Sequence, residues 1–324
     1  MKALVTKDKK GLPSYLDIQP KDQKNSNSSV VELKYSALNR RDHWITKGLY
    51  PGITSGVIMG SDGMGSFNDR RVVINPAIHW GSNSRVQSDD FRVLGLPQDG
   101  TFSAKVAVPY ENIHDVPSHM TDIEASALPL AGLTAYRVLF SRCNLQSGDK
   151  ILISGVGGGV AHFVLLFAVA HGANVTVTSS SNKKIEKAIS LGASHGVNYK
   201  MDHWYTKCKS LAPEGFDVII DSAAGDGFSH FIDLSAPGAR IGIYGGTRGE
   251  IGSINPQVLF WRQISILGST MGSPSDFSSM LHFVQKHRIK PVIDAVYPMS
   301  EYKKAFKRLA ESEQFGKIVF DNEK

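Results

Sequence analysis

The chain has 324 residues, of which 41% are hydrophobic and 20% charged, which is enough for roughly two domains with a core each. Its two cysteines, Cys143 and Cys208, lie far apart in the sequence and exclude a disulfide framework or a thiolate-rich metal site. The formal charge of +6 comes from lysines and arginines spread along the chain without a recognised binding module, so we expect no nucleic acid as the main ligand.

The N-terminus, MKALVTKDKK, lacks the long apolar core and the cleavage site of a secretory signal. No later stretch approaches the about 18 apolar residues that a membrane-spanning helix needs. We therefore expect an intracellular, cytoplasmic protein with no membrane segment. The polar run at 21–29 is expected to form a solvated turn.

The first 120 residues predict an irregular β-rich lobe. Short β-prone segments at 3–6, 30–35, 71–74 and 104–108 are separated by Pro, Gly, Asn and Ser. The loop at 75–100 is longer than compact domains usually contain, and such a loop beside a cofactor domain often forms a substrate cleft. Within it His79 precedes Trp80, a pair more often packed or exposed than bound to a metal.

The segment KILISGVGGGVA at 150–161 is the most informative in the chain. A short β-prone run leads into four glycines within five positions and then into an apolar helix. A loop with so little side chain lets a pyrophosphate approach the backbone at a helix N-terminus, where the dipole favours negative charge. The strict G-x-G-x-x-G pattern is not met, so a dinucleotide cradle at Gly157, Gly158, Gly159 and Val160 needs support from the surrounding elements.

The elements after this loop alternate between helix and strand. We expect helices at 160–171, 182–191, 203–212 and 227–235, and strands at 174–178, 196–198, 216–221, 240–244 and 264–267. Together with the strand before the glycines, this alternation predicts an α/β fold with a doubly wound, parallel, six-stranded Rossmann sheet. The helix predicted at 302–310 and the strand at 317–320 are expected to rejoin the first lobe.

The end of the second strand decides which dinucleotide is favoured. A carboxylate about 20 residues beyond the glycines would hold the ribose diol of NAD. The sequence instead carries hydroxyls at Ser179 and Ser180 and an ammonium group at Lys183, with no acid before Glu186. These groups are the donors that a 2′-phosphate needs, which favours NADPH. The alternative is an ordinary helix cap with solvated lysines.

Small residues follow the later strands of the sheet. Ala223 and Gly245 stand where the carboxyl ends of parallel strands bind ligands, although turn residues are common there too. Gly268 and Ser269 are candidates for backbone contacts to the nicotinamide amide.

The whole chain resembles the medium-chain dehydrogenase/reductase superfamily, and specifically its zinc-free branch of quinone oxidoreductase-like and enone reductase-like enzymes. The landmarks are ALNRRD at 37–42, GLYP at 48–51, LPLAGLTAY at 128–136, SGD at 147–149, LGA at 191–193, NY at 198–199, ILGS at 266–269 and GKIV at 316–319. The resemblance implies a Rossmann domain at 123–286 and a GroES-like catalytic domain formed by 1–122 and 287–324. It also implies cofactor contacts at Thr134 and Tyr199, and a homodimer that pairs through the strand at 264–267.

Zinc alcohol dehydrogenases of this superfamily hold the catalytic metal with Cys, His and Cys. Here those positions carry Asn39, Ser61 and Leu130, which cannot form a tetrahedral nitrogen and sulfur site, so we expect no metal. Hydride transfer then depends on positioning and on donors aimed at the developing oxyanion, which suits conjugated acceptors.

The resemblance places Tyr50 and Asn39 beside the nicotinamide, as first and second candidates for the catalytic donor. Each has a structural alternative, because Tyr50 could simply bury its ring in a turn and Asn39 could fix a loop. We expect Arg41 and Asp42 to form a structural ion pair.

The sequence thus predicts an NADPH-dependent, zinc-independent oxidoreductase that transfers hydride to a quinone or an α,β-unsaturated carbonyl. Two alternatives stay open: a zinc-free aldehyde or alcohol oxidoreductase, and a non-catalytic NADPH-binding protein.

Overall fold

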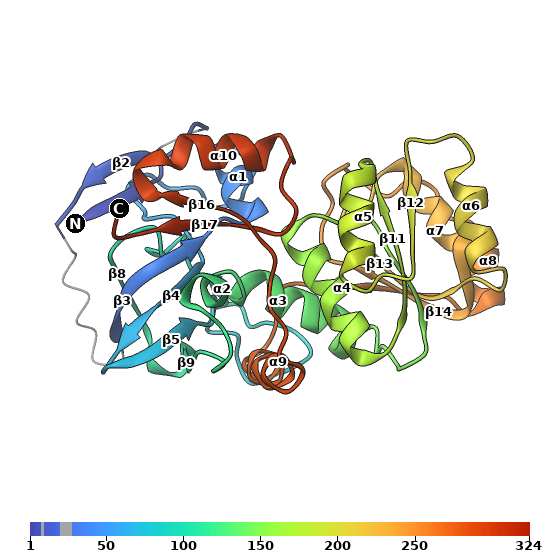
Figure 1. The fold of residues 1–324 in the computed structure, drawn as a ribbon, viewed down its shortest axis with the longest axis horizontal. Helices are drawn as coiled ribbons and strands as arrows, with labels where there is room; N and C mark the ends of the chain where they lie inside the picture. Colours follow the sequence, from blue (N-terminus) through green and yellow to red (C-terminus); the bar gives the residue numbers. More distant parts are fainter. Residues whose placement is uncertain (8–9, 20–27) are drawn as a thin grey trace. The chain divides into compact units, whose positions relative to one another are not determined.

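The computed structural model describes residues 1–7, 10–19 and 28–324, and it divides into two compact units (Figure 1). Unit 1 consists of residues 1–133 and 272–324, and unit 2 of residues 134–271. This division differs from the expected boundaries near 122 and 286. The helix α2 (Asp122–Ser126) packs against strands of unit 1, and α9 (Pro274–His287) stacks Phe277 on His114 of the same unit.

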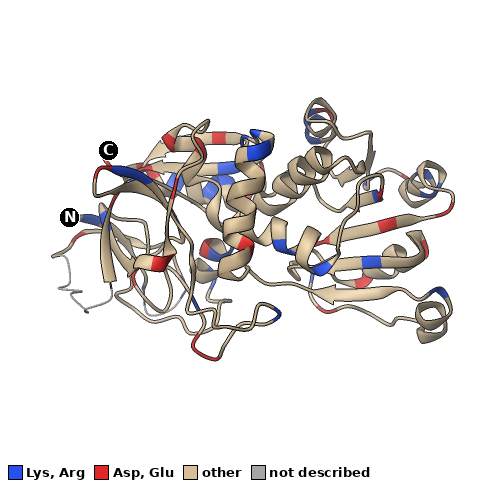
Figure 2. Cartoon of the chain, turned by 90° about the horizontal axis from the view of Figure 1, so that it is seen from below, with Lys and Arg blue, Asp and Glu red and all other residues tan. Residues whose placement is uncertain are grey.

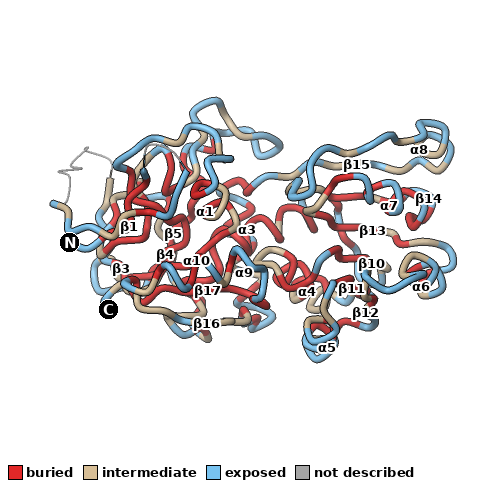
Figure 3. Tube along the Cα trace, turned by 90° about the horizontal axis from the view of Figure 1, so that it is seen from above, coloured by how far each residue is buried: buried red, intermediate tan, exposed pale blue. Residues whose placement is uncertain are grey.

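Among the described residues, unit 2 holds a six-stranded sheet in the order β12-β11-β10-β13-β14-β15. The strands are β10 (Lys150–Ile153), β11 (Asn174–Ser179), β12 (His195–Asn198), β13 (Phe216–Asp221), β14 (Ser235–Ile243) and β15 (Ser265–Gly268). Every neighbouring pair is parallel. The predicted doubly wound sheet is confirmed, and its apolar strands are buried because helices cover both faces (Figure 3).

The helices of unit 2 divide between the two faces of this sheet. On one face lie α4 (Gly159–His171) and α5 (Asn182–Ser190); on the other lie α6 (Trp204–Leu211), α7 (Ser229–Leu234) and α8 (Pro256–Arg262) (Figure 1). The second face encloses an apolar cluster that includes the fully buried Phe216 and Phe228. Burial of each such ring stabilises the fold by about 1.5–3 kcal/mol.

Unit 1 is built on a mixed β-sheet that runs β16-β17-β3-β4-β5-β9, with β8 paired to β3. Its strands are β3 (Ser28–Ala37), β4 (Asp62–Phe67), β5 (Arg70–Ile74), β8 (Lys105–Pro109), β9 (Ile113–Asp115), β16 (Ile293–Pro298) and β17 (Lys317–Asp321), while β1 (Lys2–Val5) pairs with β2 (Ser14–Asp17). Its helices are α1 (Arg40–Thr46), α2, α9, α10 (Tyr302–Ala310) and the start of α3 (Pro129–Tyr136), which continues as a π-helix over Arg137–Arg142. The strand β17 pairs with β3, so the C-terminal segment rejoins the first lobe as predicted.

Two expectations for unit 1 need correction or qualification. Most of the polar run at 21–29 lies outside the described residues, but Ser28 and Ser29 form the start of β3 rather than a turn, because they pair with β8. The long loop at 75–100 contains a short ladder between β6 (Ala77–Ile78) and β7 (Arg92–Val93).

The two residues singled out in this loop differ in exposure, because His79 is exposed and Trp80 is not. Trp80 is buried and stacks edge-on against Phe91, and its indole donates to the carbonyl oxygen of Asn83. Within residues 1–7, 10–19 and 28–324, no cluster of three or more His, Cys, Asp or Glu side chains could hold a metal ion.

The charged residues are dispersed over both units, with Lys and Arg interspersed among Asp and Glu (Figure 2). In the described part of the chain, no helix is both long and apolar enough to cross a membrane.

Candidate functional site

The glycine loop turns from β10 into α4 and exposes its backbone. Gly155 and Gly157 have φ angles of +64° and +123°, which side-chain-bearing residues rarely adopt. A Cβ atom at Gly157 would lie 2.9 Å from Cδ of Lys184, so the aliphatic part of that lysine lies against the loop. A Cβ atom at Gly155 or Gly158 would meet no described atom within 4 Å, so the space beside these positions is open.

Gly158 is the N-cap of α4, where no side chain can cap the first turn. The four N-terminal N–H groups of a helix have no intrahelical partner, and an anion is the usual substitute for a missing cap. Gly159 and Val160 form the first positions of this helix, so the four predicted cradle residues lie together.

Hydrogen bonds to two strands fix the shape of this loop. The amide of Val156 donates to the carbonyl oxygen of Thr178 at 2.8 Å, and the amide of Ser154 donates to that of Ile220 at 3.0 Å. The hydroxyl of Ser154 donates to Oδ1 of Asp221. Because its anchors lie in β11 and β13, the cradle is preorganised by the sheet.

The same aspartate shapes the turn after β13. Oδ2 of Asp221 accepts the amides of Ala223 at 3.1 Å and Ala224 at 2.7 Å. The small residues predicted there thus lie at the carboxyl edge beside the cradle. After the next strand, a Cβ atom at Gly245 would come 3.0 Å from the carbonyl oxygen of Ser222, so glycine allows these two turns to approach each other closely.

The residues predicted to bind the 2′-phosphate gather where β11 and β12 end. The amide of Tyr199 donates to the carbonyl oxygen of Ser179 at 3.0 Å. The hydroxyl of Ser179 is buried and accepts the amide of Ser181, whereas the side chains of Ser180 and Lys183 are exposed. Ser181 is the N-cap of α5, but its hydroxyl makes no capping hydrogen bond with the described residues. The alternative of a helix cap with solvated lysines is thus met in part, because Ser181 holds the N-cap position and Lys183 is exposed, but no serine hydroxyl caps the helix.

The remaining cofactor candidates lie at the far end of the sheet and on α3. Gly268 ends β15 and its carbonyl oxygen accepts Nε of Arg142 at 2.8 Å. The amide of Ser269 donates to the carbonyl oxygen of Ile243. The hydroxyl of Ser269 is buried and has no hydrogen-bond partner in the described ranges. Thr134 is buried on α3. A buried hydroxyl without a partner, an open glycine cradle and an uncapped helix all fit a bound dinucleotide.

A buried polar cluster in unit 1 contains Asn39 and Leu130, two of the three residues that the family resemblance places at zinc-ligand positions. Nζ of Lys317 donates to Oδ1 of Asn39 at 2.7 Å and to Oδ2 of Asp62 at 2.8 Å, and both charged side chains are at most 1% exposed. Nδ2 of Asn39 also donates to Asp62, whose other oxygen accepts the amide of Leu130. The amide group of Asn39 is thus fully engaged by protein partners.

Arg41 connects this cluster to Tyr50. Its Nη1 donates to Oγ of Ser61 at 2.7 Å, and its Nε donates to the phenolic oxygen of Tyr50 at 3.3 Å. The guanidinium carbon lies 4.7 Å from the centroid of the tyrosine ring, within the range of a cation–π contact. Because the phenolic oxygen accepts from Arg41, the phenolic proton is left to donate elsewhere.

The predicted ion pair between Arg41 and Asp42 is wrong. Consecutive helical side chains do not face each other, and Arg41 instead donates to Ser61, Tyr50 and two backbone carbonyls. Oδ2 of Asp42 accepts the amide of Asn39, while Oδ1 is buried without a partner among the described residues. Burial raises the pKa of Asp42 to about 6, although Arg41 opposes the shift.

Sequence reasoning did not identify Asp62 and Lys317 as partners, because 255 residues separate them. One signal was available: a lysine begins the apolar run KIVF, and where such a lysine is buried its charge needs an acidic partner.

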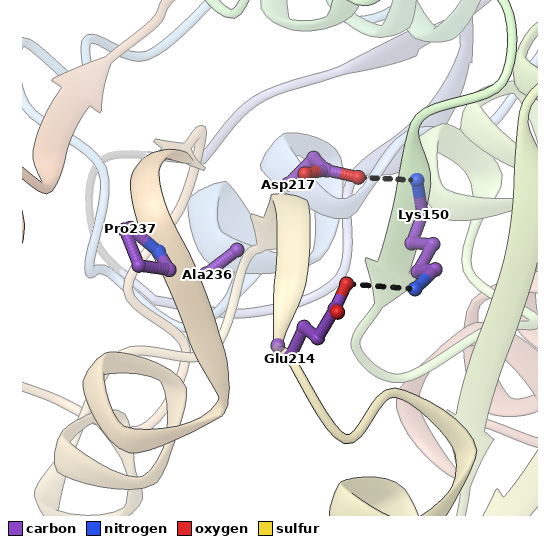
Figure 4. Close-up of a pocket in the computed structure, with 6 residues that line it drawn as sticks. Lys150, Glu214, Asp217, Ala236 and Pro237 are labelled. Atoms are coloured by element: carbon purple, nitrogen blue, oxygen red, sulfur yellow. Dashed lines mark hydrogen bonds and ion pairs between the residues drawn. The ribbon is translucent and has the colours of Figure 1, made fainter.

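A surface hollow lies away from the cradle, lined by Lys150, Glu214, Gly215, Asp217, Ala236 and Pro237 (Figure 4). Lys150 begins β10, and the other residues lie near the starts of β13 and β14. These are the amino ends of parallel strands, whereas doubly wound sheets bind ligands at the carboxyl ends. The hollow is therefore not a candidate for the nucleotide.

Comparisons with known proteins agree with this geometry. A family model described as "Zinc-binding dehydrogenase" matches residues 159–286. The chain is 32% identical to a zinc-type alcohol dehydrogenase-like protein YogA of Leptosphaeria maculans, over 95% of this chain and 94% of that protein. It is 29% identical to the quinone oxidoreductase of Rattus norvegicus, over 67% of this chain and 68% of that protein.

Solved structures show the same fold. The crystal structure of an NAD-dependent alcohol dehydrogenase superposes with a TM-score of 0.92 at 30% identity, covering 99% of both chains. The quinone oxidoreductase of Thermus thermophilus, solved alone and with NADPH, superposes with a TM-score of 0.83 at 23% identity, covering 99% of this chain and 100% of the other. The chain belongs to the medium-chain dehydrogenase/reductase superfamily and to its quinone oxidoreductase-like branch.

Proposed function

We propose that this oxidoreductase uses NADPH to reduce a quinone or an α,β-unsaturated carbonyl without a catalytic metal. The observation that carries the proposal is the cluster around Lys317. Asn39, Ser61 and Leu130 offer an amide, a hydroxyl and a hydrocarbon where zinc relatives have ligands, and a fixed ammonium group already donates to Asn39. Such a site lacks the nitrogen and sulfur donors that zinc prefers, and the carboxylate of Asp62 is already paired with Lys317.

NADPH is supported by the residues at the ends of β11 and β12. No carboxylate is present from Ser179 to Ile185, and Ser180 and Lys183 present a hydroxyl and an ammonium group to solvent. Similar solved structures include an NAD-dependent enzyme and one solved with NADPH, so the choice for this chain depends on its own residues. When bound, NADPH supplies the hydride.

Tyr50 is the better supported of the two donor candidates. The amide of Asn39 is engaged by Lys317 and Asp62, so Asn39 is not available to stabilise a developing oxyanion. The half-buried phenol of Tyr50 accepts from Arg41, which orients it to donate its own proton. A donor fixed in this way can stabilise and protonate the enolate or phenolate oxygen that forms when hydride adds to a conjugated acceptor.

The test of this function is a substrate panel measured by NADPH consumption. We expect turnover with an enone and a quinone, and much slower turnover with a saturated aldehyde, because a plain carbonyl gains no activation from a metal ion. Turnover of the aldehyde alone would establish the zinc-free aldehyde or alcohol oxidoreductase instead. Tight NADPH binding without turnover across the panel would establish a non-catalytic NADPH-binding protein.

We also propose that the protein forms a homodimer through the outer edge of β15. This strand ends the sheet order, so its outer edge pairs with no described strand. The preceding helix α8 contains no buried residue and exposes Phe260 and Trp261 to 66% and 80%. Exposed aromatic side chains beside an unpaired strand edge are typical of an interface. The cytoplasmic location stays a prediction.

The homodimer is tested by light scattering after size-exclusion chromatography. We expect a dimer for the unmodified chain and a monomer for Trp261→Glu, because a carboxylate cannot be buried unpaired in an apolar contact. Tyr110→Glu changes an aromatic residue that is 59% exposed in unit 1, and it should stay dimeric. A monomer in the unmodified chain, or a dimer in Trp261→Glu, would contradict this interface.

A further inference from the structure

Arg248 follows β14, but its side chain contacts a residue that follows β12, at the other side of the sheet. It lies in the segment that follows β14, yet its guanidinium carbon is 5.8 Å from the ring centroid of Tyr199, which follows β12. In the sheet order β14 and β12 are four strand spacings apart, or about 19 Å at about 4.8 Å each. The segment after β14 therefore extends along the carboxyl edge toward β11 and β12.

The backbone at Arg248 is held in place by the turn after β13. The amide of Arg248 donates to the carbonyl oxygen of Ala223 at 2.8 Å, and that of Thr247 donates to the carbonyl oxygen of Ser222 at 3.2 Å. Gly225 has a φ angle of +71°, and a Cβ atom there would come 2.9 Å from Cβ of Arg248. Only a glycine permits this approach, so the position of the arginine is built into the fold.

The charge of Arg248 has no acidic partner in the described ranges. No carboxylate lies within salt-bridge distance of it, and Glu250, two residues further on, does not pair with it. Its aromatic neighbour Tyr199 is hydrogen-bonded through its amide to Ser179, the first residue of the predicted phosphate site. An exposed guanidinium group without a carboxylate partner in the described ranges thus lies against the ring of Tyr199, whose backbone is hydrogen-bonded to Ser179.

We propose that Arg248 is a specificity residue that binds the 2′-phosphate of NADPH together with Lys183, with the ring of Tyr199 supporting its guanidinium. A phosphate dianion is best met by two cations, and a guanidinium group donates two parallel hydrogen bonds to one phosphate where an ammonium group acts as a point charge. Lys183 comes from the segment after β11, and Arg248 comes from the segment after β14. This inference rests on the proposed use of NADPH.

The experiment measures dissociation constants for NADPH and NADH by fluorescence titration. Arg248→Ala should weaken NADPH binding by about tenfold or more, since hydrogen bonds to charged groups are the strong ones, and should change NADH binding by less than about twofold. Arg248→Lys should keep part of the preference for NADPH over NADH, because it keeps the positive charge and loses the two parallel hydrogen bonds of the guanidinium group. Lys187→Ala removes an exposed cation one turn further along α5 and should bind both cofactors normally.

Thermal unfolding without cofactor checks that each variant is folded. Equal losses for the two cofactors in Arg248→Ala, or no loss, would overturn the role of Arg248. If the unmodified chain prefers NADPH and Lys183→Ala loses that preference while Arg248→Ala keeps it, only this inference fails. If the unmodified chain shows no preference for NADPH, the proposed cofactor itself is wrong, and the two failures are thereby distinguished.

Discussion

Lys183 is the residue on which the proposed cofactor preference most depends. It is exposed at the start of α5 and forms no ion pair with described residues, so its ammonium group is available to a ligand. Lys183→Ala should weaken NADPH binding by about tenfold, because a charge-assisted hydrogen bond to phosphate is lost, and should leave NADH binding nearly unchanged. Titration of both cofactors measures this, with Lys187→Ala as the control. Equal losses for NADPH and NADH would argue against a phosphate site.

Tyr50 is the residue on which the proposed chemistry depends. Tyr50→Phe keeps the ring against Arg41 and removes only the hydroxyl, so kcat with an enone should fall by about 100-fold while the NADPH dissociation constant stays the same. Steady-state kinetics measures this loss. Tyr15→Phe changes another half-buried tyrosine of unit 1 and should keep full activity. A kcat for Tyr50→Phe within about twofold of the unmodified value would show that the phenol only packs.

Asp42 should make stability depend on pH. Its pKa is about 6 in the folded chain and 3.8 as the ordinary value, so between these values the folded state binds more protons than the unfolded state. The free energy of unfolding should therefore fall as pH rises through this window. Urea unfolding should show Asp42→Asn gaining about 2 kcal/mol relative to the unmodified chain between pH 4 and pH 7, because one pKa unit is about 1.4 kcal/mol and most of the shift lies within this range.

The matched control for this experiment is Asp89→Asn, which changes an exposed aspartate. Its difference from the unmodified chain should stay constant over the same pH range. A constant difference for Asp42→Asn as well would mean that folding does not raise the pKa of Asp42, which would contradict this account.

Single residues were predicted well where the backbone alone sets their place and poorly where long-range contacts do. The glycines of the cradle lie where the local pattern required, because a strand, a tight turn and a helix start are local features. The pair Lys317 and Asp62 was not predicted, since only the folded sheet brings β17 and β4 together with α1. For the same reason the partners of Arg41 were misassigned.

At the scale of elements, the turn from β10 into α4 should serve both cofactors equally. Gly158→Ala adds a methyl group that meets no described protein atom within 4 Å but enters the open side of the cradle. Binding of NADPH and NADH should weaken by the same factor, about tenfold or more, because the pyrophosphate common to both can no longer approach the backbone.

The free energy of unfolding should change by less than about 1 kcal/mol in Gly158→Ala, since the N-cap backbone is extended and its φ is negative. Gly227→Ala also adds a methyl group into open space but lies in the 3-10 helix Asp226–Phe228, and as the matched control it should bind both cofactors normally. A selective loss of NADPH alone in Gly158→Ala would contradict a pyrophosphate cradle.

Elements with strong periodicity were predicted closely, and short ones were not. The strand β13 and the helix α10 have the predicted bounds, because a β-branched apolar run and an amphipathic pattern are readable locally. No prediction was made for α9, which a Ser273 cap and Pro274 begin. The two-residue strands β6 and β7 exist only through their mutual pairing, which no local pattern records.

At the scale of the whole molecule, the path of the chain through the two units determines which features come from one continuous segment and which need both ends of the chain. Unit 1 is left at residue 133 and re-entered at 272, and β17 completes its sheet by pairing with β3. The nucleotide features therefore lie in one continuous segment, while the cluster of Asn39, Asp62 and Lys317 needs both ends of the chain. For this reason the nucleotide features could be predicted from the sequence, whereas the cluster of Asn39, Asp62 and Lys317 could not.

The most direct test of the account is turnover with metal-free protein. We predict that protein treated with a strong chelator, with residual zinc measured by mass spectrometry, keeps the same kcat/KM for NADPH-dependent reduction of an enone. Added Zn²⁺ should not raise it, because Asn39, Ser61 and Leu130 provide no zinc ligand set. Loss of activity with the chelator and its recovery with stoichiometric Zn²⁺ would contradict the central claim that this chain reduces its substrate without a metal.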